Sequence, residues 1–83
     1  MSQNNTSSFE SEFPYIGQVD AQGVQYRFPF RTILDAVTQA MTYAGYEAEK
    51  TDKGVLWSVW ERGTGYTKLE NAVKYGVVSG KKK

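Results

Sequence analysis

The sequence predicts a small α+β domain in which two strands and a helix are followed by two further strands and a second helix (ββαββα). Turn-type tetrapeptides at residues 20–23 and 51–54 each separate two strand-like segments. Thr-x-x-acid sequences beginning at Thr32 and Thr67 each precede a helix-like segment. The expected architecture is a four-stranded, mainly antiparallel sheet with both helices packed on one face.

A weak internal echo points the same way. When Gly23 is set over Gly54, residues 15–28 lie over residues 46–59. The matches are few, so chance is an alternative to a structural repeat. The order of strand, strand and helix is predicted without the echo.

The first half predicts a hairpin. Residues 15–19 and 24–30 are the expected strands, and the second of them alternates apolar and polar side chains with a period of two. Gly23 supplies the positive φ that a hairpin turn needs. Pro29 lacks an N–H, so it belongs at the end of its strand or on a sheet edge.

Residues 32–44 are predicted to form the first helix. Thr32 can cap its start, with Asp35 three residues on, and Gly45 is placed to end it as a left-handed cap. Apolar residues at spacings of three and four define one buried face: Ile33, Leu34, Val37, Ala40, Met41 and Ala44.

The second half is predicted to repeat this order. Residues 46–50 form a weak strand pattern, and residues 55–61 form a strong one that is rich in β-branched and aromatic side chains. Residues 67–76 follow as a helix, with Thr67 and Glu70 as a capping box. The core is then expected between sheet residues Val24, Tyr26, Phe28, Phe30, Val55, Trp57 and Val59 and helix residues Ile33, Val37, Met41, Leu69 and Val73.

Length and composition limit the functional classes. The polar segment 1–12 is expected to be disordered, residues 13–78 to form one domain, and residues 79–83 to form a basic tail. A domain this small is not expected to enclose a cofactor. The chain has no cysteine and no histidine, which removes disulfides, thiolate metal sites and the commonest general base. Without a basic N-terminal region or a long apolar run, neither a signal peptide nor a membrane span is expected, and a cytoplasmic location is the default.

The charges are unevenly placed. Residues 1–61 carry four basic and eight acidic side chains, whereas residues 62–83 carry six basic side chains and Glu70, so the two parts carry about −4 and +5. A basic end can steer a protein toward an anionic partner, but three of these lysines, at residues 81–83, belong to the predicted tail. Lysines that only keep the protein soluble are the alternative.

The second face of the sheet carries the candidate binding site. Because side chains alternate along residues 55–61, Leu56 and Trp60 point away from the predicted core, which is unusual for a face in water. Tryptophan and arginine are enriched in interaction hot spots. We therefore predict a partner-binding site that comprises Trp60, Leu56, Arg27, Gln25, Arg62 and Tyr66. Two alternatives are that Trp60 folds over the sheet edge to cap the core, or that an N-terminal segment with Phe9 and Phe13 covers it.

Other kinds of site fit the sequence less well. The acidic residues do not cluster as a catalytic pair would, and a solvated strand exterior explains Glu47 and Glu49. The loop 62–67 could offer backbone N–H groups to an anion, but it lacks the glycine and lysine pattern of a P-loop, and a flexible connection is the alternative. We therefore expect no catalytic residue, no metal and no cofactor.

The sequence thus predicts a non-enzymatic binding module. It would be an inhibitor or regulator that recognises another protein through the open sheet face and adjacent loops, and a homodimer is a further expectation. Small regulators of this kind are often encoded by phages or mobile elements. The alternative is a single-stranded nucleic-acid-binding protein that stacks bases on Trp60 beside Arg27, Arg62 and the lysine tail. The stronger strands carry more acid than base, which argues against that alternative.

Overall fold

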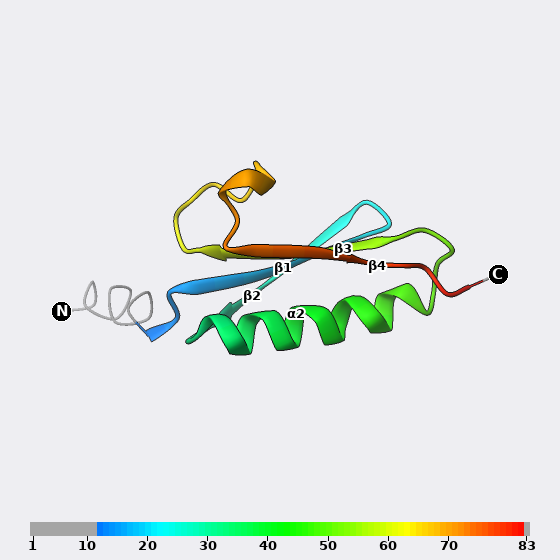
Figure 1. Cartoon of the computed structure of the whole chain (residues 1–83), viewed down its shortest axis with the longest axis horizontal. Helices are drawn as coiled ribbons and strands as arrows, with labels where there is room; N and C mark the ends of the chain where they lie inside the picture. Colours follow the sequence, from blue (N-terminus) through cyan, green and yellow to red (C-terminus); the bar gives the residue numbers. More distant parts are fainter. Residues whose placement is uncertain (1–11, 83) are drawn as a thin grey trace.

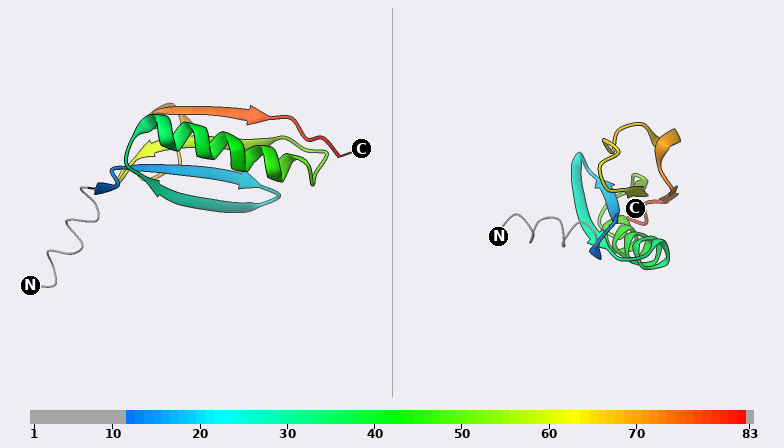
Figure 2. Two further views of the ribbon diagram at one scale, coloured as in Figure 1. Left: turned by 90° about the horizontal axis from the view of Figure 1, so that it is seen from below. Right: turned by 90° about the vertical axis from the view of Figure 1, so that its left-hand side faces the viewer.

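The computed structural model describes residues 12–82. In this part of the chain an antiparallel sheet with the strand order β2-β1-β3-β4 carries the helix α2 on one face (Figure 1). The loop that joins β3 to β4 lies on the opposite face (Figure 2). The elements are β1 (Tyr15–Ala21), β2 (Val24–Phe30), α2 (Ile33–Ala48), β3 (Val55–Glu61), a short 3₁₀ helix (Leu69–Asn71) and β4 (Lys74–Val78).

The α+β class and the four-stranded antiparallel sheet are confirmed, whereas the order ββαββα is not. The predictions for β2 and β3 agree with the structure at both ends. The prediction of a disordered N-terminal segment falls, apart from Glu12, outside the described residues.

The predicted hairpin is present. β1 and β2 pair antiparallel along their whole length. Gln22 and Gly23 form the turn with φ values of 51° and 83°, which is the left-handed geometry of a two-residue type I′ hairpin loop. β2 lies at one edge of the sheet, where the missing N–H of Pro29 is tolerated.

Helix α2 extends past its predicted end at residue 44. Gly45 does not end it, because Glu47 and Ala48 continue its buried side, and a glycine inside a helix costs only about 1 kcal/mol relative to alanine. The prediction of a strand at residues 46–50 is therefore wrong, since this segment is the last turn of α2 and the start of the following loop.

The second predicted helix, at residues 67–76, is not formed. Lys68, not Thr67, precedes the short 3₁₀ helix, and it makes no side-chain capping hydrogen bond. The chain then enters β4, which pairs antiparallel with β3. Gly76 suits this position because an added Cβ would lie 2.9 Å from the indole of Trp57. The two halves of the chain therefore do not repeat one structure.

The two threonines of the predicted capping boxes can be compared directly. The backbone N–H of Asp35 donates to Thr32 Oγ1 at 3.1 Å, whereas Thr67 caps no helix. We expect Thr32→Ala to lower the free energy of unfolding by about 1 kcal/mol and Thr67→Ala to change it by less than about 0.5 kcal/mol. Urea denaturation measures both values. An equal loss at the two sites would contradict the structure in which Thr67 caps no helix.

A column of alanines allows α2 to lie close to the sheet. Ala36, Ala40, Ala44 and Ala48 recur every four residues, and all four are buried. β1 also has a residue without a side chain, Gly17, on the face that α2 covers. An added Cβ there would lie 2.8 Å from the Phe30 ring. The sheet residues of this core are Val19, Ala21, Val55, Trp57 and Val59, with Tyr15, Tyr26, Phe30 and Val78 packed against it.

The alanine column replaces part of the predicted core. Leu34 and Met41 were expected to be buried, but they are exposed on the flank of α2. Leu69 and Val73, expected on a second helix, lie in the segment between β3 and β4. The assignment of Trp57 to the face that carries the helix is confirmed, whereas Phe28 lies on that face but remains more than one-third exposed.

Tyr43 extends the core toward the β2 edge. Its ring makes edge-to-face contacts with Tyr26 and Phe28, with centroid separations of 5.2 and 5.4 Å. Partial burial and the nearby carboxylate of Glu47 raise the pKa of the Tyr43 hydroxyl. Glu47 is itself buried, and its Oε2 lies 3.6 Å from Lys50 Nζ.

The C-terminal end is attached to the segment between α2 and β3. The backbone N–H of Lys81 donates to the carbonyl of Ala48 at 2.8 Å, and that of Lys82 donates to Thr51 at 3.0 Å. Gly80 lies against the backbone of the same segment, where an added Cβ would collide. The predicted tail is thus held to the domain as far as Lys82.

Candidate protein-binding surface

The face of the sheet opposite α2 is formed by the side chains that alternate with the core residues. We call it the outer face. Its register brings three rows across the sheet: Pro29, Ile16 and Trp60 in the first, Arg27, Gln18, Ser58 and Tyr75 in the second, and Gln25, Asp20, Leu56 and Val77 in the third. The first row lies at the end where β3 leads into the loop, and the third lies toward the β1–β2 turn.

The loop at residues 62–73 covers the first end of the outer face (Figure 1). Trp60 is only 1% exposed, although it points away from the main core. Its indole N–H donates to Ser58 Oγ at 2.8 Å, and its ring meets the edge of Tyr66 at a centroid distance of 6.0 Å. Together with the buried Ile16, these residues form a second apolar layer between sheet and loop.

Tyr66 holds the loop against the sheet. Its hydroxyl accepts a hydrogen bond from the backbone N–H of Gly63 at 3.0 Å, and the guanidinium of Arg27 lies 5.0 Å from its ring centroid. Tyr66 has a φ of 58°, a left-handed conformation that is costly for a residue with a side chain. The contacts with Trp60 and Arg27 offset that cost.

Polar side chains occupy the middle of the outer face. Arg27 donates from Nε to Gln18 Oε1 at 2.6 Å and from Nη2 to Gln25 Oε1 at 3.3 Å. Gln18 is buried, and its amide donates in turn to Asp20 at 3.3 Å. Arg27 therefore satisfies a buried amide as well as packing on Tyr66.

The structure brings four of the six predicted site residues together, but these four make contacts within the chain that hold the loop and the sheet in place. Trp60 is buried beneath the loop, Tyr66 and Arg27 hold that loop in place, and the backbone N–H and Nε of Arg62 donate to the carbonyls of Pro14 (2.8 Å) and Phe13 (2.9 Å). Trp60 is thus not an accessible contact residue, which corrects the sequence-based assignment.

The first alternative for Trp60, a position over the sheet edge, is not found, because the indole lies beneath a loop. The second, a covering N-terminal segment, is described only at Phe13. The covering segment is the chain's own loop between β3 and β4, and Phe13 lies instead beneath the guanidinium of Arg31 at 4.8 Å. Phe9 falls outside the described residues.

The other two predicted residues, Leu56 and Gln25, lie in the third row, which the loop does not reach (Figure 1). Next to Leu56 the structure places two side chains that were assigned to a helix or its end. These are Tyr75, which is 56% exposed, and Val77, which is 67% exposed, both on β4. We call Leu56, Tyr75 and Val77 the β4 patch. The β-branched pair at residues 77–78 was the sequence signal for a strand here.

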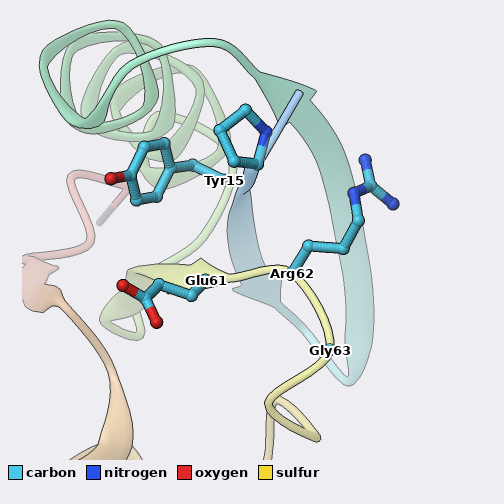
Figure 3. Close-up of a pocket in the computed structure, with 5 residues that line it drawn as sticks. Tyr15, Glu61, Arg62 and Gly63 are labelled. Atoms are coloured by element: carbon cyan, nitrogen blue, oxygen red, sulfur yellow. The ribbon is translucent and has the colours of Figure 1, made fainter. Parts of the chain in front are cut away.

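A separate depression of about 420 Å³ lies where β1 begins and β3 ends, and it is open to solvent (Figure 3). Tyr15 and Glu61 line it, whereas the Arg62 side chain points away from both toward β2. The N–H of Gly63 already donates to Tyr66, which leaves the loop less suited to an anion. Among residues 12–82, no group of three carboxylate, histidine or cysteine side chains is placed to hold a metal ion.

Comparison with protein-family models, curated proteins and solved structures finds no significant match to this chain. No helix in the described range is both long and apolar enough to cross a bilayer.

Proposed function

We propose that this chain is a non-enzymatic protein-binding module, an inhibitor or regulator, that recognises its partner through the β4 patch and the polar side chains beside it. One observation carries the proposal. The chain covers the apolar residues at one end of its outer face with its own loop, yet it leaves Tyr75 in the middle row and Val77 at the other end exposed.

The composition of this end suits a protein interface. An apolar centre with a polar rim is the usual arrangement of such interfaces. Here Leu56, which lies beside Val77, is followed across the sheet by Asp20 and then Gln25. Tyrosine adds a large contact area at low cost in side-chain entropy.

The proposal is tested by affinity capture from the cells that produce the protein, with a matched pair of tyrosine variants. Tyr46 on α2 is 65% exposed and Tyr75 is 56% exposed, so Tyr46→Ala is a control for Tyr75→Ala on the opposite side of the domain. We expect Tyr75→Ala to weaken retention of a protein partner by about 2 kcal/mol or more in binding free energy, and Tyr46→Ala to leave it unchanged. Equal retention by both variants would contradict the proposal.

Single-stranded nucleic-acid binding is a second candidate, and one observation favours it. Lys50, Lys53 and Lys82 line one open depression, because the C-terminal end is held beside the segment that follows α2. Trp60 is buried, so base stacking would have to use Tyr75 instead. Titration with an oligothymidine at several salt concentrations separates the two functions. A steep loss of affinity with salt, reduced by Lys82→Ala, would favour nucleic acid.

A further inference from the structure

The free edge of β4 carries little of the protection that keeps edge strands from pairing with other molecules. Natural edge strands are protected by proline, by charged side chains or by bulges. β2, the other edge, carries Arg27 and Pro29. β4 has the sequence KYGVV, in which Lys74 at its start is the only charged residue, and it contains no proline. In the described part of the chain nothing pairs with its outer edge.

The sequence of β4 is complementary to itself in the antiparallel direction. A two-fold axis at Gly76 places Tyr75 opposite Val77 of a second copy, and Lys74 opposite Val78 of that copy. An aromatic residue opposite a β-branched one is a favourable cross-strand pair. The Lys74 side chains of the two copies are not opposite each other in this register.

We propose that the partner of this edge is a second copy of the chain, which pairs β4 with β4 about Gly76 to form one continuous antiparallel sheet. This inference rests on the proposed function, because the dimer pairs the backbone edge of the same strand, β4, whose outward side chains form the proposed binding surface. Pairing in this register keeps the two α2 helices on the same side of the sheet, because residues that are directly opposite in antiparallel strands share a face.

The dimer would also join the two β4 patches. Val77 of each copy lies beside its own Leu56 and opposite Tyr75 of the other copy, so the apolar strip crosses the two-fold axis without interruption. Edge pairing leaves the outer face of this strip open. The dimer would therefore present one apolar surface, twice as long as the β4 patch, to a further protein partner. Each such surface would be built from two chains.

Engineered cysteines test this register, because the chain has none of its own. Tyr75→Cys and Val77→Cys proteins are prepared separately, with different mass labels, and oxidised alone and as a mixture. In the proposed register, Cα atoms of residues 75 and 77 of opposing copies lie about 5 Å apart, within reach of a disulfide. Identical positions lie diagonally, at about 7–8 Å. We expect severalfold more cross-linked dimer in the mixture than in either protein alone.

Sedimentation of the unmodified chain accompanies the cross-linking, together with Val77→Glu and with Tyr46→Glu as an exposed control. We expect a dimer for the unmodified chain and for Tyr46→Glu, and a monomer for Val77→Glu. A monomeric unmodified chain, or cross-linking that does not prefer the mixture, would overturn the inference. The affinity capture with Tyr75→Ala is scored on a retained protein other than the chain itself, so a failure of the dimer and a failure of the proposed function are distinguishable.

Discussion

Replacing Trp60 with alanine should lower the free energy of unfolding by about 3–5 kcal/mol, which would unfold much of so small a domain. The indole is 1% exposed, it packs on Tyr66, and its N–H donates to Ser58. Its removal would leave a cavity between sheet and loop and would leave the Ser58 hydroxyl without its donor. Thermal or urea denaturation followed by circular dichroism measures the loss.

A conservative variant separates packing from the hydrogen bond. Trp60→Phe retains an aromatic ring beneath the loop but removes the indole N–H, so we expect a smaller loss than for Trp60→Ala. If Trp60→Ala melts as the unmodified protein does but no longer retains a protein partner, Trp60 is a contact residue as the sequence predicted, and the described loop position is wrong.

Enlarging the alanine column should also have a large effect. Ala40 is 2% exposed where α2 lies on the sheet, so Ala40→Leu must move the helix away or force its neighbours into poor rotamers. We expect a loss of about 1–3 kcal/mol in the free energy of unfolding. The same denaturation measurements report it.

Leu34→Ala is the matching control on the same helix. Leu34 is 74% exposed, so we expect its truncation to change the free energy of unfolding by less than about 0.5 kcal/mol. The sequence-based assignment, in which Leu34 and Ala40 share the buried face, predicts the opposite for Leu34. A loss of several kcal/mol in Leu34→Ala would therefore show that α2 is rotated relative to the described structure.

Local sequence signals predicted the elements that local chemistry determines. β2 and β3 agree at both ends because alternation and β-branched or aromatic side chains mark them clearly. The turn at Gly23 and the cap at Thr32 are also confirmed, since each depends on neighbouring residues alone. Gly45 misled the prediction because burial of Glu47 and Ala48 outweighs the helix-ending preference of glycine.

The structure of the second half of the chain depends on contacts between residues that are distant in the sequence. Thr67 and Glu70 have the spacing of a capping box, but pairing with β3 draws residues 74–78 into the sheet. That error removed Tyr75 and Val77 from the predicted site. The outward direction of Leu56 and Trp60 was confirmed by the strand register, whereas the burial of Trp60 depends on the path of a loop that periodicity cannot predict.

The most direct test of binding through the β4 patch is to map the contact surface by NMR on the isotope-labelled chain, with and without the captured protein partner. We expect the largest changes in amide and methyl signals at Leu56, Tyr75 and Val77, with a smaller change at Gln25 in the row of Leu56, while the signals of Trp60 and of α2 change little. Changes centred on Trp60 and Tyr66, or on the exposed side of α2 around Tyr46, would contradict it.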